Sequence, residues 1–222
     1  YIAAYIYGYI DLEITIISDA LNFPPGSCIF GYGLILGSGI MMIHLFIRYH
    51  QLLSRPANLR PPRSLIEYGF WSGTFASLGT SFVGGFQLSN MPITHWVGAT
   101  VAFGSGCTFA YIETLCTSYA TPQDRFLITV RGCSAVVQSI TFVLTLIGTN
   151  AAYLTRGEIR TPQNKHIGHE WLMLGAISEW ILVTCTALFV ASFARDFKHI
   201  KLLSPQVIKV IIATCLKCRF ES

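Results

Sequence analysis

Charged side chains are scarce in this chain of 222 residues, of which 12% are charged and 52% are hydrophobic. An ordinary soluble domain carries about 25% charged residues, so the composition argues against a water-soluble fold. The few charges are clustered, which leaves uncharged runs at 28–47, 68–96 (broken only by His95) and 132–154. Each run is long enough to cross about 30 Å of hydrocarbon at about 1.5 Å per residue. The sequence therefore predicts membrane helices.

Enzymatic motifs are also missing: the chain has no Walker loop, no dinucleotide fingerprint and no nucleophile elbow. The segment from His166 to Glu170 superficially resembles a zinc motif. It does not have the His-Glu-x-x-His order, and Gly168 interrupts it. Basic residues lie at the edges of the predicted helices, which gives no support to nucleic-acid binding. We therefore expect no enzymatic activity, no cofactor and no metal.

Neither disulfides nor glycans mark the outer face of the chain. No Asn-x-Ser/Thr acceptor occurs. Four of the seven cysteines lie inside predicted helices and two lie in the basic tail, so they do not form a disulfide framework. The seven are Cys28, Cys107, Cys116, Cys133, Cys185, Cys215 and Cys218.

The pattern of apolar runs predicts an all-α polytopic membrane protein with a bundle of six transmembrane helices. The run at 1–10 is too short to span a membrane and is interpreted as the second half of a truncated first helix. A cleaved signal peptide is the alternative, although the run lacks a basic start. We expect a six-helix domain over residues 1–195 and a basic amphipathic cytoplasmic tail over 196–222. The expected spans are 1–10, 28–47, 66–87, 93–117, 132–154 and 171–194.

Lys and Arg are distributed unequally between the two faces. Short loops rich in these residues stay in the cytoplasm, so the richer face is predicted to be cytoplasmic, together with both termini. The opposite face carries three: Arg156, Arg160 and Lys165. The loops after the second and fourth helices and the tail carry twelve: Arg48, Arg55, Arg60, Arg63, Arg125, Arg131, Arg195, Lys198, Lys201, Lys209, Lys217 and Arg219.

Two neighbouring helices carry a small residue at every fourth position, which lets helix backbones approach closely. A turn of only about 88–92 connects them, so we expect a tight antiparallel hairpin. The stripes are Gly73, Ser77, Ser81 and Gly85 on the first helix, and Gly98, Ala102, Gly106 and Ala110 on the second.

Ionisable side chains inside predicted membrane helices are costly, and they mark candidate functional positions. Glu179 lies about 12 Å deep along the last helix, with no basic residue expected at its depth. Gln87, His95 and Asp19 are expected on the same, non-cytoplasmic side, where they form with Glu179 a candidate intramembrane polar site. An interfacial histidine satisfied by local hydrogen bonds is the alternative for His95.

A second polar cluster is predicted near the cytoplasmic side from His44, Arg48, Glu67 and Glu113. Ion pairs with Arg48 or hydrogen bonds between helices explain these residues without any ligand.

The tail has apolar residues at helical spacing between basic ones, a pattern typical of a helix that lies on an anionic membrane surface. Lys209, Lys217 and Arg219 are its candidate surface contacts. Cys215 and Cys218 beside these bases either accept palmitate or remain unmodified thiols.

Several motifs in order resemble the damage-regulated autophagy modulator (DRAM) superfamily, including its transmembrane-protein-150, or tentonin, branch. The motifs are Ile17-Ser18-Asp19, the run at 24–31, Arg48-Tyr49, the run at 83–87, His95, Glu179-Trp180 and Arg195-Asp196-Phe197. Gly85 departs from the asparagine usual in relatives, and Leu202-Leu203 lacks the upstream acid of a lysosomal sorting signal.

The DRAM branch implies a lysosomal or endosomal regulator of autophagy that acts through protein partners or local lipids. The tentonin branch implies a plasma-membrane adaptor or channel-associated subunit that docks a lipid-kinase scaffold or a channel. A lipid or small-molecule transporter that uses Glu179 is the third hypothesis, and it predicts a cavity that reaches Glu179.

Overall fold

The computed structural model describes residues 16–20, 22–156 and 168–198, and within these ranges every regular element is a helix. The predicted first helix at 1–10 and the amphipathic part of the tail lie outside the described residues. Contacts within the chain divide it into two compact units, Tyr1–Ala191 and Ser192–Ser222. The helices are α2 (Ile17–Ala20), α3 (Gly26–Leu53), the short 3-10 helix η1 (Ala57–Leu59), α4 (Arg63–Gly85), α5 (Pro92–Ala120), α6 (Arg125–Arg156), α7 (His169–Ala191) and α8 (Ala194–Phe197).

Local backbone chemistry explains where several of the long helices begin or end. α3 continues six residues beyond the predicted end at 47, because charged residues do not break a helix whereas the nearby Pro56 does. Pro92 occupies the first turn of α5, where its missing N–H costs nothing. α6 begins at 125 rather than at the predicted 132, and the Asp124 carboxylate caps it by accepting the N–H of Leu127 at 3.0 Å.

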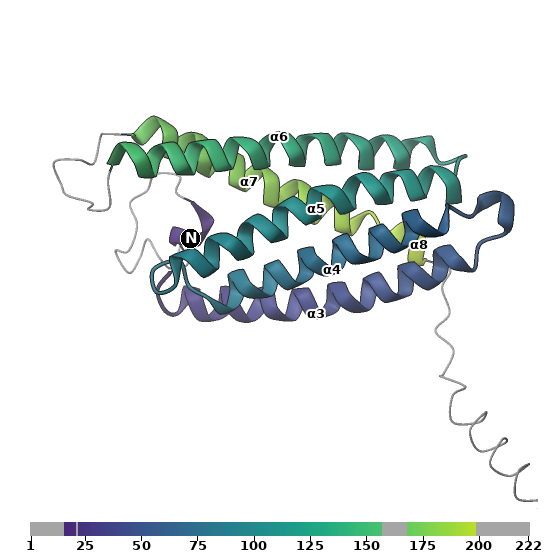
Figure 1. Ribbon diagram of the computed structural model, residues 1–222, viewed down its shortest axis with the longest axis horizontal. Helices are drawn as coiled ribbons and strands as arrows, with labels where there is room; N and C mark the ends of the chain where they lie inside the picture. Colours follow the sequence, from purple (N-terminus) through teal and green to yellow (C-terminus); the bar gives the residue numbers. More distant parts are fainter. Residues whose placement is uncertain (1–15, 21, 157–167, 199–222) are drawn as a thin grey trace, which may run out of the picture. The chain divides into compact units, whose positions relative to one another are not determined.

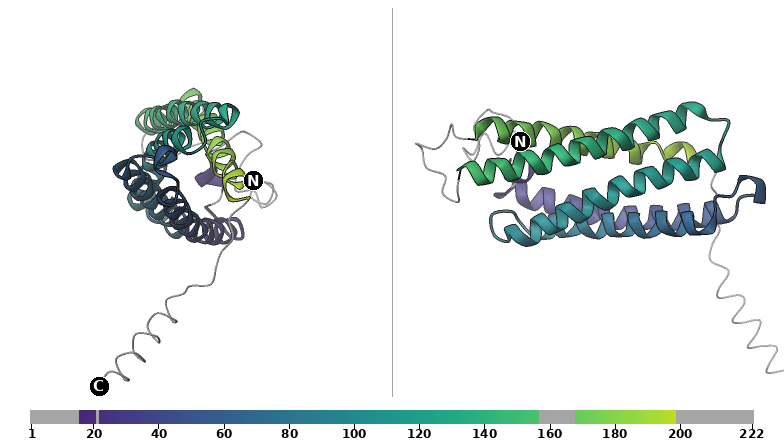
Figure 2. Two further views of the ribbon diagram at one scale, coloured as in Figure 1. Left: turned by 90° about the vertical axis from the view of Figure 1, so that its right-hand side faces the viewer. Right: turned by 45° about the horizontal axis from the view of Figure 1, so that its top comes forward.

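In the first unit, each long helix packs against the next one along the chain, from α3 through α4, α5 and α6 to α7 (Figure 1). Short connections join α3 to α4, α4 to α5 and α5 to α6, so these neighbours are antiparallel. The end-on view in Figure 2 shows the five helices as a curved layer, with α2 on its inner side near α7.

Close helix approaches depend on glycines, but not on all of those in the predicted stripes. A Cβ on Gly79 would lie 2.7 Å from the carbonyl oxygen of Gly98, and a Cβ on Gly31 would lie 2.5 Å from that of Gly84. Gly85, by contrast, has open space around it, so the stripe prediction was wrong there. The contact face of α4 curves around the helix, because 3.6 residues per turn do not keep every fourth residue in line.

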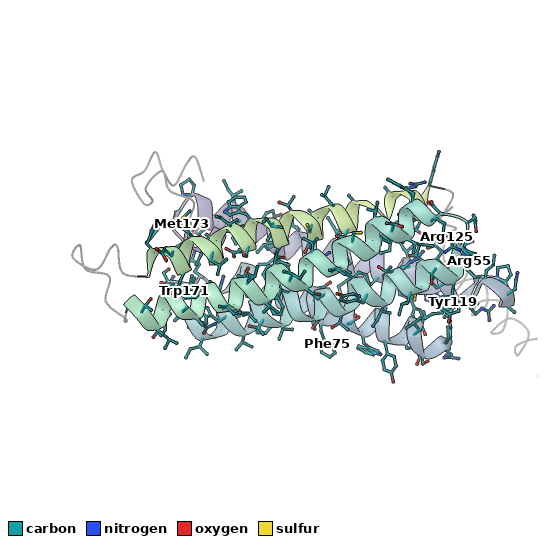
Figure 3. All side chains as sticks on the ribbon, turned by 90° about the horizontal axis from the view of Figure 1, so that it is seen from above. Arg55, Phe75, Tyr119, Arg125, Trp171 and Met173 are labelled. Atoms are coloured by element: carbon teal, nitrogen blue, oxygen red, sulfur yellow. The ribbon has the colours of Figure 1, made fainter. Side chains whose placement is uncertain are left out.

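The outward face of the bundle is apolar, which suits a hydrocarbon environment better than water. On α4, large exposed side chains recur three or four residues apart; they are Tyr68, Trp71, Phe75, Leu78 and Phe82. Figure 3 shows Phe75 on the outside of the bundle, with Trp171 and Met173 at one end and Arg55, Tyr119 and Arg125 at the other. Polar hydroxyls in the helices bond to their own backbones, as Thr80 does to the carbonyl of Ala76 at 2.9 Å.

Within the described parts of the chain, three segments are long and apolar enough to be membrane spans: Gly26–Leu53, Arg125–Thr155 and His169–Phe197. α4 and α5 reach about 35 and 44 Å at about 1.5 Å per residue, which also exceeds the hydrocarbon thickness. Their lower hydropathy has a structural cause, because the Gly, Ser and Thr residues that permit close packing are less apolar than Leu or Ile.

Candidate functional site

A cavity of about 480 Å³ opens between α5, α6 and α7 at the end of the bundle where α7 begins. This volume lies within the range of about 300 to 1,000 Å³ typical of small-molecule sites. α2, with Ile16 before it and Asn22 after it, and the α4–α5 connection contribute to its wall, and its polar lining includes Asp19, His95 and Glu179. Three of the four residues of the predicted intramembrane polar site therefore share one cavity.

Glu179 lies on α7 and is only 7% exposed. Its Oε2 atom accepts a hydrogen bond of 2.7 Å from the backbone N–H of Ile17. This bond joins two segments 162 residues apart in sequence and holds α2 against α7. Among the described residues, Glu179 Oε1 accepts no hydrogen bond.

His95 is held in one orientation by hydrogen bonds on both ring nitrogens. Nδ1 lies 2.7 Å from the carbonyl oxygen of Phe86, and Nε2 lies 3.0 Å from the Ser18 hydroxyl. A carbonyl oxygen can only accept, so Nδ1 carries the proton, and in a neutral imidazole Nε2 accepts from Ser18. His95 thus fastens the segment 16–22 to α5, as the bond to Glu179 fastens it to α7.

Gln87 does not line this cavity. α4 ends at Gly85, and Gln87 lies in the connection to α5, where its Oε1 accepts a hydrogen bond of 2.6 Å from Asn90. The prediction that Gln87 joins Glu179 was wrong, because the helix ends two residues earlier than expected and the side chain bonds within its own turn.

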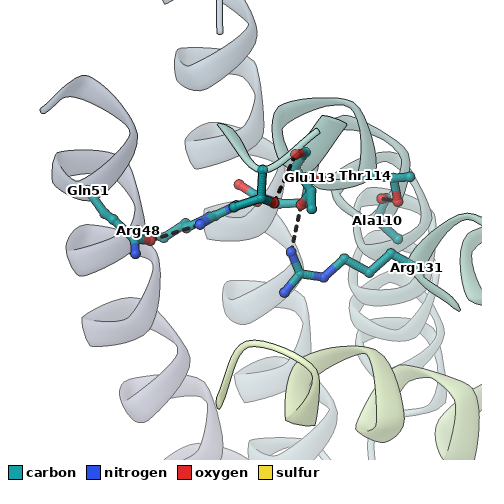
Figure 4. Close-up of polar contacts among 8 residues, drawn as sticks. Arg48, Gln51, Ala110, Glu113, Thr114 and Arg131 are labelled. Atoms are coloured by element: carbon teal, nitrogen blue, oxygen red, sulfur yellow. Dashed lines mark hydrogen bonds and ion pairs between the residues drawn. The ribbon is translucent and has the colours of Figure 1, made fainter. Parts of the chain in front are cut away.

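The second polar cluster centres on a buried ion pair between Arg48 of α3 and Glu113 of α5, with 3.0 Å between Nε and Oε2 (Figure 4). A second nitrogen of Arg48, Nη1, donates to Gln51 at 2.8 Å. Arg131 of α6 donates to the Thr117 hydroxyl at 2.6 Å, and Thr117 donates to the backbone oxygen of Glu113 at 2.7 Å.

Of the other two residues predicted for this cluster, Glu67 has its printed ion pair elsewhere. Glu67 accepts a hydrogen bond of 2.9 Å from Arg63 on the exposed surface of α4, one helical turn away. It also borders a small aromatic pocket with His50 and Trp71. His44 lies on α3 one turn before Arg48 and is half-buried.

Arg131 and Gln138 were not singled out from the sequence. Arg131 was assigned to a cytoplasmic loop, yet it lies inside α6 with no exposed surface, 6.0 Å from the centre of the Phe189 ring. Gln138 is buried between α6 and α7, where it donates to Ser134 and accepts from Thr186 at 3.2 Å. Asp124 is a typical N-cap residue, and it could have predicted that the helix begins before Arg131. No sequence signal marks Gln138 as a contact between helices.

Two groups of predicted residues lie outside the described part of the chain. They are the predicted membrane-surface residues of the tail, Lys209, Lys217 and Arg219, and the candidate palmitoylation sites Cys215 and Cys218. Within the described ranges, no three His, Cys, Asp or Glu side chains gather as metal ligands do.

Residues 1–200 match the protein family described as the Frag1/DRAM/Sfk1/Cwh43P N-terminal domain. Similar curated proteins include two kinds of named autophagy modulator. One is the modulator of macroautophagy TMEM150B-B of Xenopus laevis, 30% identical over 184 residues, or 83% of this chain and 71% of that protein. Another is the human DNA damage-regulated autophagy modulator protein 2, 25% identical over 219 residues, or 91% of this chain and 79% of that protein.

A shorter stretch matches more closely. Human modulator of macroautophagy TMEM150B is 39% identical over 99 residues, which is 45% of this chain and 41% of that protein. No solved structure matches.

Proposed function

Since this chain belongs to the Frag1/DRAM/Sfk1/Cwh43P N-terminal domain family, we propose that it is a multi-pass membrane regulator of autophagy, acting through protein partners or local lipids. The family match over nearly the whole chain carries this proposal, and relatives from both branches are named as modulators of autophagy. The membrane location is supported by three candidate spans and by the apolar outer face of the bundle.

The proposal includes a topology of six spans with both termini in the cytoplasm, and a lysosomal or endosomal location. The unequal distribution of Lys and Arg supports the orientation. The plasma membrane is the alternative location, and there the chain would act as an adaptor or channel-associated subunit.

Autophagic flux in cells tests this function directly. We expect expression of the full-length protein to raise the lysosome-dependent turnover of an autophagosome marker, and its depletion to lower that turnover. A tagged protein should coincide with a lysosomal or endosomal marker. Unchanged flux in both experiments, or a tag confined to the plasma membrane, would contradict the proposal.

A truncation after Leu203 separates partner binding from folding. If the tail recruits a partner, the truncated protein still reaches the membrane, does not raise flux and loses a co-purifying protein in mild detergent. Replacement of Lys209, Lys217 and Arg219 by Gln is the matched test of a lipid-binding tail, because it removes charge without shortening the chain. Full activity of both variants would place the regulatory surface in the helical domain instead.

Transport of a lipid or small molecule is a second candidate function, and the cavity that reaches Glu179 favours it. Ionisable groups inside membrane helices commonly mark substrate or proton pathways. A transporter must open its site to each side in turn. Reconstitution into liposomes with entrapped candidate solutes tests this, with Glu179→Gln expected to abolish any uptake that the wild type shows.

A further inference from the structure

The cavity at the start of α7 has walls of unequal chemistry. The segment 16–22 and α7 supply the carboxyl groups of Asp19 and Glu179. The wall from α5 and α6 contributes no carboxyl group; it combines apolar side chains, among them Ala99, Phe103 and Phe142, with uncharged polar ones such as Thr145 and Thr149. A single ligand that satisfied both walls would have a polar end and an extended apolar part.

The charges that line the cavity are of one sign. Its described lining contains Asp19 and Glu179 but neither Lys nor Arg. A buried carboxylate requires a partner, because removal of its hydration is costly. Glu179 receives one backbone hydrogen bond on Oε2, and Oε1 accepts none among the described residues. A ligand cation with N–H donors supplies what this oxygen needs.

Aromatic rings at the cavity also suit a cation. Trp96 of α5 and Tyr153 of α6 both line it, and their rings meet edge to face with 6.1 Å between centroids. The face of an indole or phenol ring attracts an ammonium group. Phe103 and Phe142 form a second pair across the same two helices at 6.3 Å, and they offer contacts to an apolar chain.

We propose that this cavity binds a long-chain amphiphile with an ammonium head group, with the head at Glu179 and the chain against the wall formed by α5 and α6. The ammonium donates to Glu179 Oε1, which leaves the bond between Ile17 and Oε2 in place. This inference deepens the proposed action through lipids, but it concerns binding alone and can hold even if the protein has no effect on autophagy.

Photolabelling of the purified full-length protein in mild detergent tests the proposal. The probes are three diazirine compounds with the same C16 chain and a primary amine, an alcohol or a carboxylic acid as the head group. We expect the amine to label at least fivefold more than the alcohol or the acid, at peptides that line the cavity. Equal labelling by all three, or amine labelling confined to other peptides, would overturn it.

Two matched substitutions locate the head group. Glu179→Gln should lower amine labelling at least fivefold, to the level of the alcohol. Glu170→Gln removes the same charge from an exposed position on the same helix and should leave labelling unchanged. Undiminished amine labelling in Glu179→Gln would overturn the assignment of the head, as would an equal loss in both variants.

A third substitution covers the case in which Glu179→Gln does not fold, as judged by gel filtration. Ala99→Phe fills the apolar side of the cavity and keeps both carboxyl groups. It should abolish amine labelling of the cavity peptides. Persistent labelling of those peptides would show that the probe binds elsewhere and would overturn the proposal. Because these readouts use purified protein, a failure here is distinct from a failure of the autophagy experiments.

Discussion

At the scale of single residues, the ion pair between Arg48 and Glu113 should be a major determinant of stability. Both side chains are almost completely buried, at 2% and 4% exposure. Glu113→Gln leaves the Arg48 guanidinium buried without its counter-charge, a change that typically costs about 3 to 5 kcal/mol. We expect a loss of this size in the free energy of unfolding, measured by titration with a denaturing detergent.

The exposed pair on α4 is the matched control for this prediction. Arg63 and Glu67 have the same chemistry and a similar distance, but their side chains are 78% and 43% exposed. Glu67→Gln should leave the free energy of unfolding nearly unchanged, because water already solvates both groups. Equal effects of Glu113→Gln and Glu67→Gln would show that the buried pair does not stabilise the helices.

At the scale of helices, the α4–α5 contact should depend on Gly79. A Cβ at this position would meet the backbone of α5, including the Gly98 oxygen at 2.7 Å, and backbone atoms cannot move aside as a side chain can. Gly79→Ala should therefore destabilise the protein by about 1 to 3 kcal/mol, although alanine favours helix formation. The measurement is the same detergent titration.

Gly37 provides the control, because a Cβ there would meet no atom within 4 Å. Gly37→Ala should raise stability by up to about 1 kcal/mol through helix propensity alone. Loss of stability in Gly37→Ala comparable to that in Gly79→Ala would mean that glycine acts through the flexibility of the helices rather than through their contacts.

α6 and α7 also approach closely at glycines, although the sequence shows no repeating stripe of small residues on these two helices. A Cβ on Gly148 would lie 2.7 Å from the Trp171 oxygen, and Gly175 packs against Thr149. Thr186 donates to Gln138 and Ser134 donates to the carbonyl oxygen of Cys185, which adds hydrogen bonds between these two helices. Close approach and buried polar contacts thus occur at one interface, which leaves the outer faces apolar for lipid.

At the scale of the whole molecule, the proposed topology places the α3–α4 connection in the cytoplasm and the α4–α5 connection on the other side. Asn58 and Asn90 are exposed in these two connections. In a background without the native cysteines, a membrane-impermeant maleimide applied to intact cells or sealed lysosomes distinguishes the sides. We expect Asn58→Cys to react only from the cytoplasm and Asn90→Cys only from the opposite side.

Labelling of both positions from one side would contradict a crossing by α4. The opposite pattern, with each residue reacting from the other side, would keep the spans but reverse the orientation deduced from Lys and Arg. Either result can be separated from misfolding, because the two variants differ from the same cysteine-free protein at one exposed position each.

The sequence by itself determined the helical class, the approximate positions of the five long helices and the family. Long apolar runs and clustered charges are local properties, so they can be identified without knowing which helices meet. Helix ends were less well predicted: Arg131 lay outside the expected span, because the prediction followed hydropathy whereas the helix begins at the Asp124 cap.

Only the tertiary structure decided which members of the two predicted polar clusters meet, and through which atoms. Glu179 and Ile17 are 162 residues apart, and Arg48 and Glu113 are 65 residues apart, so no local pattern pairs them. Gln87 was expected beside Glu179 but bonds within its own turn. A membrane helix can turn a polar side chain toward any neighbour, and the choice is made by close packing at glycines such as Gly79, which sets how the helices face each other.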